Sequence, residues 1–147
     1  MTSNVKPTER TRYSLPISKL RGVPTGLRVA LKNQKITNCD QLLAAAGEAE
    51  KRADLVRNAH VNPELLLRIV QRADMARVNG VGAVFGMMLE DLGIRDVQAL
   101  ARQDPAELHE RVRAYNTAER LARRSPTPEE VEDWVRQAKA LPVIVTY

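Results

Sequence analysis

Apolar residues recur with a helical period directly after a glycine-rich segment in the middle of the chain. The apolar positions lie at spacings of i, i+3, i+4 and i+7, as on one face of a helix, and they are Phe85, Met88, Leu89 and Leu92. Gly93 follows where a glycine commonly ends a helix. Gly80 and Gly82 precede the pattern, and we expect one of them to adopt backbone angles that cost other residues energy. The pattern predicts a tight turn that leads into an amphipathic helix.

The same arrangement of apolar residues occurs 58 positions earlier, with Gly22 in place of Gly80. Every inward position is apolar in both segments, and the pairs are Leu27 and Phe85, Ala30 and Met88, Leu31 and Leu89, Ile36 and Ile94, Cys39 and Val97, and Leu42 and Leu100. Cys39 thus matches a core valine, which favours a buried apolar role over a nucleophilic one. The agreement predicts an internal repeat, and we expect Leu27, Leu31, Phe85 and Leu89 to share one core.

Further helices are indicated by capping residues that precede a proline. Asn62, Asp104 and Thr127 each stand before a proline and then an amphipathic stretch, and Thr127 can form a capping box with Glu130. The expected inward residues are Leu66, Ile69, Val70 and Ala73, then Leu108, Val112 and Tyr115, and finally Val131, Trp134, Val135 and Ala138. A charged helix is expected over residues 48–59 with Ala53 and Val56 inward, and a loop near residues 116–126.

These elements predict an all-α fold, a single domain of two repeats related by a pseudo-twofold axis. We expect a flexible basic arm over residues 1–14, a domain over residues 15–141, and a tail over residues 142–147. The first repeat covers residues 15–75 and the second residues 76–141. The β-prone tail either folds back over the core or adds a strand to a partner's sheet, and the first of these is the favoured interpretation.

Composition and charge narrow the classes of function. The chain has 147 residues, a net charge of +5 and one cysteine, so an intramolecular disulfide and a cysteine metal cluster are both excluded. Five aromatic residues are too few for a row of base-stacking platforms. No apolar run approaches the roughly 20 residues of a membrane span, and a cytoplasmic location is expected. Residues 1–35 hold eight lysines and arginines against one glutamate, which favours an acidic partner such as nucleic acid.

The motifs over residues 15–141 resemble an uncharacterised bacterial family of tandem helix-hairpin-helix proteins, one of the domains of unknown function. The resemblance rests on residues 79–82, 89–94, 104–108 and 128–141. The chain is also similar, more distantly, to the paired helix-hairpin-helix domains of DNA repair proteins. That resemblance implies binding to duplex DNA through its backbone, without reading sequence, by turn amides and nearby basic side chains.

The first hypothesis for function is therefore a duplex DNA-binding module that contacts phosphates. The residues expected to contact the nucleic acid are Arg21, Gly22, Arg28, Lys32, Lys35, Gly80 and Gly82. Two features run against the resemblance: Pro24 replaces a turn glycine and lacks an N–H group, and Glu90 and Asp91 lie on the helix after the second turn.

A protein-interaction or scaffold module that reuses the same fold is the second hypothesis. An enzyme is not expected, because the acidic pairs Glu90-Asp91 and Glu132-Asp133 are adjacent on helices and diverge. His60 and His109 lack metal-ligand spacing, so neither a metal nor a cofactor is predicted. The possible partners are thus duplex DNA or another protein, and not a membrane.

Overall fold

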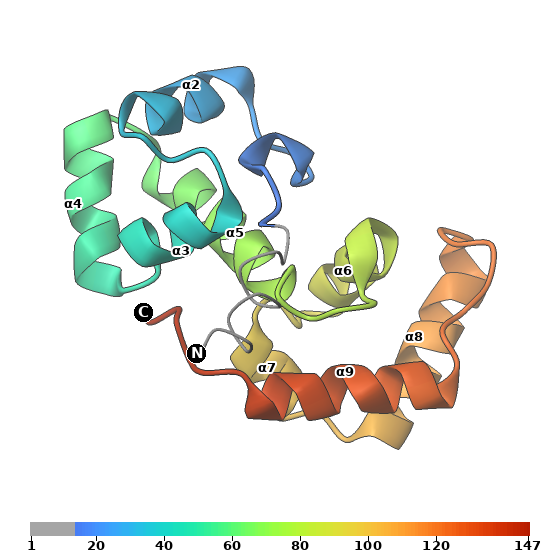
Figure 1. Ribbon diagram of the computed structural model, residues 1–147. Coiled ribbons are helices and arrows are strands. Elements are labelled where there is room, and N and C mark those ends of the chain that lie inside the picture. The colour runs from blue at the N-terminus through green and yellow to red at the C-terminus, as the bar shows by residue number, and fades with distance from the viewer. Residues whose placement is uncertain (1–13) are drawn as a thin grey trace, which may run out of the picture.

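The computed structural model describes residues 14–147, and the predicted basic arm lies almost wholly outside the described residues. The described part of the chain is helical and contains no strand, as predicted (Figure 1). The elements, in chain order, are the 3-10 turn η1 Ile17–Lys19 and the helices α2 Thr25–Asn33, α3 Cys39–Ala46, α4 Ala49–Ala59, α5 Pro63–Met75, α6 Gly82–Asp91, α7 Val97–Ala101, α8 Pro105–Glu119 and α9 Pro128–Ala140.

Capping side chains fix where several helices begin. The Asn62, Asp104 and Thr127 side chains each accept a hydrogen bond from the amide three residues on, and a proline follows each of them. Thr127 and Glu130 form the predicted reciprocal capping box, with bonds of 2.8 and 3.1 Å. The three predicted helix starts are confirmed, because these side chains satisfy amides that have no partner within the helix.

The helices form two hydrophobic clusters, where one shared core was expected. Leu27 and Leu31 belong to a cluster built by η1 and helices α2 to α5, whereas Leu89 belongs to another built mainly by α6 to α9. Phe85 is only partly buried and packs against the second cluster. The expectation of one core was wrong because each group of four helices buries its apolar stripes internally. Figure 1 shows the two groups side by side, with α5 running between them.

Helix α4 turns a charged residue inward where apolar residues were expected. Val56 packs against the first cluster as expected, but Ala53 is exposed, and Arg52 and Leu55 are buried. The Arg52 guanidinium donates to the carbonyls of Ala46 and Gly47 at 3.2 and 2.8 Å, so it satisfies the end of α3. Assigning faces by hydropathy alone fails here because a buried guanidinium with carbonyl partners is stable inside the fold.

The last residues of the chain join the two groups of helices. After α9 the chain crosses to the first group, where the Val145 side chain is 1% exposed within the first cluster. Thr146 N donates to Gly47 O at 3.0 Å, and the Tyr147 hydroxyl donates to Asp96 of the second group. The tail therefore folds back over the helices, which was the favoured interpretation of its sequence.

Candidate nucleic-acid interface

Two glycine turns precede α2 and α6, and both use backbone angles that favour glycine. In the Gly22 turn, residues 20–24, Gly22 has a φ of 72°. In the Gly80 turn, residues 79–82, Gly80 and Gly82 have φ values of 94° and 69°. A Cβ added to Gly22 would lie 2.6 Å from Nη1 of Arg72, so a side chain at this position would require the Arg72 guanidinium to move. The prediction of a strained turn before α6 is confirmed.

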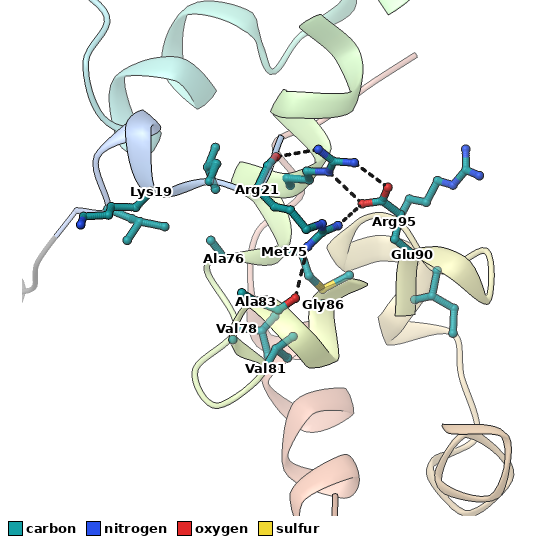
Figure 2. Close-up of a pocket in the computed structure, with 15 residues that line it drawn as sticks. Lys19, Arg21, Met75, Ala76, Val78, Val81, Ala83, Gly86, Glu90 and Arg95 are labelled. Carbon is teal, nitrogen blue, oxygen red and sulfur yellow. Dashed lines mark hydrogen bonds and ion pairs between the residues drawn. The ribbon is translucent and has the colours of Figure 1, made fainter. Parts of the chain in front are cut away.

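Arg21 connects the Gly22 turn to α6. Its Nη1 donates to the carbonyl of Ala83 at 3.2 Å, and its Nη2 contacts Glu90 at 2.6 Å. Its own carbonyl accepts a hydrogen bond of 2.6 Å from Arg72 of α5. In Figure 2 the side chains of Arg21 and Glu90 point toward each other from the two groups of helices. Arg21 therefore ties the Gly22 turn to α6, the helix that follows the Gly80 turn.

Glu90 is shared by two arginines. Arg72 donates to both of its carboxylate oxygens at 3.0 and 2.9 Å, and Arg21 adds the third contact. The hydrogen bond from Arg72 is the main reason that the pKa of Glu90 lies below its usual value. Partial burial, followed by the nearby charge of Arg72, lowers the pKa of Arg21. All three side chains are at most 28% exposed, so Arg21, which was predicted to contact phosphate, belongs to a partly buried group of ion pairs.

The other predicted basic residues lie on the surface. Arg28, Lys32 and Lys35 are exposed along α2 and just beyond its end. None of the three forms an ion pair with a carboxylate of residues 14–147. Arg28 and Lys32 are four residues apart and share one face of the helix, beginning next to the Gly22 turn. This face of α2 is exposed to solvent.

Pro24 and the acidic pair Glu90 and Asp91, which ran against the resemblance, lie at the start of α2 and at the end of α6. Pro24 is the N-cap residue of α2, so the N-terminus of that helix lacks one donor. Glu90 and Asp91 are the last two residues of α6, about 12 Å from its first residue at a rise of about 1.5 Å per residue. Glu90 is paired with arginines, and Asp91 accepts a hydrogen bond of 2.8 Å from the Tyr115 hydroxyl. Asp91 thus lies away from the N-terminus of α6, whereas the Glu90 carboxylate shares the Arg21 guanidinium with the carbonyl of Ala83 in the first turn.

A basic residue that sequence reasoning missed lies near the start of α6. The Arg124 guanidinium carbon is 5.9 Å from the centre of the Phe85 ring, one turn into that helix. Arg124 also pairs with Glu130 at 2.7 and 2.9 Å. The hydrogen bond between Arg124 and Glu130 is the main cause of both pKa shifts. It raises the pKa of Arg124 and lowers the pKa of Glu130 to about 2. Arginines at positions 120, 123 and 124 were a visible signal, but only the fold brings Arg124 to α6.

Asn116 holds the segment that carries Arg124. Helix α8 extends to Glu119, so it occupies part of the segment in which a loop was expected. The buried Asn116 side chain accepts from Ala122 N at 2.9 Å and donates to Ser125 Oγ at 3.2 Å. The loop therefore has a fixed shape, because its backbone is bonded to the helix that precedes it.

The remaining sequence predictions concern the single thiol and the acidic and histidine side chains. Cys39 is buried in the first cluster, and burial is the main cause that raises the pKa of its thiol to about 11. Among residues 14–147 no three His, Cys, Asp or Glu side chains are grouped so as to hold a metal ion. Over the same residues, no helix combines the length and apolar character needed to cross a bilayer.

Comparison with known protein families gives one match. Residues 25–141 match the model described as Domain of unknown function (DUF4332). The chain belongs to this family. The match covers all eight α-helices, and it leaves out η1 and the tail. No curated protein and no solved structure matches the chain.

Proposed function

We propose that this member of the DUF4332 family binds the backbone of duplex DNA without reading its sequence. The observation that carries the proposal is the link that Arg21 makes from the Gly22 turn to α6, the helix after the Gly80 turn, with exposed cations beside both helices. The helices after the two turns would face neighbouring phosphates. Backbone contacts of this kind supply affinity and register, but they carry no base information.

Repeated helix-hairpin-helix units are part of this proposal, and the helix positions support them. A shift of 58 moves the last residue of α2, Asn33, onto the last residue of α6, Asp91. It also moves the capping residue Asn38 onto the capping residue Asp96. A shift of 65 superposes the bounds of α5 on those of α9. We interpret the two groups as copies of one four-helix unit, the second lengthened by the loop before α9.

The N-terminus of α6 supports contact with an anion. Its first turn contains no acidic residue, and its N-cap residue Val81 makes no side-chain capping bond. Amides at the start of a helix point along its axis, and the helix dipole adds about half a positive charge there. Gly82 and Ala83 in this turn are exposed. A phosphate oxygen could therefore approach their backbone closely.

Four exposed cations lie beside α2 and α6, and one of them, Arg124, already pairs with Glu130. Arg124 lies beside α6, and Arg28, Lys32 and Lys35 extend along α2. Each phosphate contact releases bound counterions, so affinity for duplex DNA should fall steeply with salt. Four contacts predict a slope of about −3.6 in a plot of log affinity against log salt concentration.

Fluorescence anisotropy with labelled duplexes of unrelated sequence tests the proposal. We expect similar affinities for all sequences of equal length and the salt slope given above. Reversing two charges, in the variant with Arg28→Glu and Lys32→Glu, should remove binding while the fold is kept. Lys139→Glu is the control, since Lys139 is exposed at the opposite end of α9 from Arg124.

A matched pair of aspartate substitutions, each at an alanine, tests whether the N-terminus of α6 contributes to DNA binding. Ala83 and Ala106 are both exposed and are both the second residue of a helix, α6 and α8 respectively. An aspartate at either site favours the helix dipole, so neither change should unfold the protein. Ala83→Asp should weaken DNA binding at least tenfold, by repelling phosphate, and Ala106→Asp should have little effect. An equal loss of DNA affinity in both variants would mean that the change in net charge alone weakens binding, and it would contradict a phosphate site at α6.

A wild-type protein that fails to bind duplex DNA even at low salt would overturn the proposal. The second hypothesis, a protein-interaction module, would then be preferred. It would be supported by a purified protein partner whose affinity depends on Arg28 and Lys32.

A further inference from the structure

We propose that the pocket between the two groups of helices binds a small organic anion with an apolar body, such as a medium-chain carboxylate. The apolar part would fill the pocket, and the charged head would remain at its rim. This site adjoins the DNA-binding surface proposed above, since Gly82 and Ala83 belong to both, but it does not depend on that proposal. Nucleic acid is not needed to test it.

The pocket has a volume of about 290 Å³, and Arg21 and Glu90 are among the residues that line it (Figure 2). Its apolar lining comes from both groups of helices, and includes Leu15, Leu20, Met75, Val78, Val81 and Ile94. Water has a share of about 30 Å³ in the liquid, so the pocket has room for about ten groups of that size. An eight-carbon chain with a carboxylate has ten heavy atoms. The volume is close to the lower end of the range for ligand pockets.

Gly86 keeps this pocket open. It lies in the middle of α6, where glycine costs about 1 kcal/mol relative to alanine. A Cβ at this position would lie 3.6 Å from a methyl group of Val81 and 4.0 Å from Nη1 of Arg21, which are ordinary contacts. Since a side chain would fit, close packing does not require the glycine here. Its structural consequence is the empty space in the pocket wall.

The charges at the rim favour an anionic head over a neutral or cationic one. Four cationic side chains line the pocket, namely Lys19, Arg21, Arg72 and Arg95, against the single carboxylate of Glu90. Glu90 forms ion pairs with Arg21 and Arg72. Lys19 and Arg95 form no ion pair with a carboxylate of residues 14–147. Figure 2 shows these two side chains extending to opposite sides of the Arg21–Glu90 pair, so a head at the rim can be met from either side.

Titration of the isotope-labelled protein with octanoate, followed by amide NMR, tests the proposal. We expect saturable shifts at the amides of Gly82 and Gly86, which line the pocket, and none at Gly26, which does not. Octan-1-ol and octylammonium serve as neutral and cationic probes of the same chain length. Octanoate should bind about tenfold more tightly than octylammonium, because two partly exposed cations each contribute a few-fold.

Substitutions in the pocket and at its rim measure separately how the apolar chain and the carboxylate of the ligand contribute to affinity. Gly86→Leu should fill the pocket and weaken octanoate binding at least tenfold, and Gly86→Ala should weaken it less while it strengthens the helix. Gly26→Leu is the control, since a side chain there meets nothing within 4 Å. The double variant with Lys19→Gln and Arg95→Gln should weaken octanoate about fivefold and leave octan-1-ol unchanged.

Three results would overturn the inference. The first is an absence of saturable shifts with octanoate, and the second is equal affinity for all three probes. The third is octanoate binding that Gly86→Leu and Gly86→Ala both leave unchanged. Each of these outcomes is independent of whether the protein binds DNA.

Discussion

Lys35 has the same left-handed backbone conformation after α2 that Gly93 has after α6. Their φ values are 65° and 89°. The residue after each closes the same hydrogen bond: Ile36 N donates to Leu31 O at 2.9 Å, and Ile94 N donates to Leu89 O at 2.8 Å. This is a common way for a helix to end, with glycine preferred at the left-handed position. In the first group a lysine fills a position that suits glycine.

Lys35→Gly should therefore stabilise the protein. The left-handed conformation costs a residue with a side chain about 1–2 kcal/mol, and glycine removes this cost. Glycine also makes the unfolded chain more flexible, which offsets about 0.4–1 kcal/mol of the stabilisation. We expect a net increase of about 0.5–1 kcal/mol in the free energy of unfolding, measured by urea denaturation. Gly93→Ala is the reciprocal change and should destabilise by about 1 kcal/mol. A loss of stability in Lys35→Gly would show that the lysine side chain makes a stabilising contact.

Glu90→Gln should destabilise the protein by about 1–2 kcal/mol, because Arg21 and Arg72 lose their shared carboxylate. The difference from wild type should depend on pH. The pKa of Glu90 is lowered in the fold, so the unfolded chain binds more protons in the acidic range and stability rises with pH there. The stabilising effect is complete above the unfolded pKa of about 4.3, and it is lost as pH falls through the lower folded value.

Urea denaturation of both proteins at several pH values measures this effect. The wild type and Glu90→Gln should differ most near neutral pH and converge below about pH 4. A difference that stays constant across this range would mean that the carboxylate charge is not the source of the stability.

Cys39 should be inert to thiol reagents while the protein is folded. Its side chain is 5% exposed, and its thiol pKa of about 11 leaves only about one molecule in a thousand as thiolate at pH 8. Reaction with a chromogenic disulfide should be slow in buffer and rapid in denaturant. Fast labelling of the folded protein would show that α3 opens readily.

Phe85→Ala should cost less than an alanine substitution deep in the core. Phe85 is partly buried and packs on Trp134 with ring centroids 5.4 Å apart, whereas Leu89 is 0% exposed. We expect a loss of about 1–3 kcal/mol for Phe85→Ala and about 2–5 kcal/mol for Leu89→Ala. Trp134 fluorescence reports the unfolding transition in both variants. The reverse order of stability would place Phe85 in the core after all.

Local patterns in the sequence predicted the helices well, because local interactions decide them. The Thr127–Glu130 capping box and the apolar stripe of α5 depend on residues at most a few turns apart. The strained Gly80 turn was likewise evident from glycine spacing. Such features need no knowledge of the rest of the fold.

Long-range contacts were the part that the sequence did not reveal. The ion pair of Arg21 with Glu90 spans 69 positions, and the approach of Arg124 to Phe85 depends on how the loop before α9 is folded. The buried Arg52 was missed for the same reason, since one of its partners is the carbonyl of Thr146. A charged residue can be assigned to surface or interior only when its distant partners are known.

The position of Val145 has a consequence for the order of folding during synthesis. The first cluster includes Ile17 near one end of the chain and Val145 near the other. The ribosome releases the first group of helices before it has made the residue that completes their core. That group therefore completes its core only after the second group has been synthesised, through a loop closure that spans nearly all of the described residues.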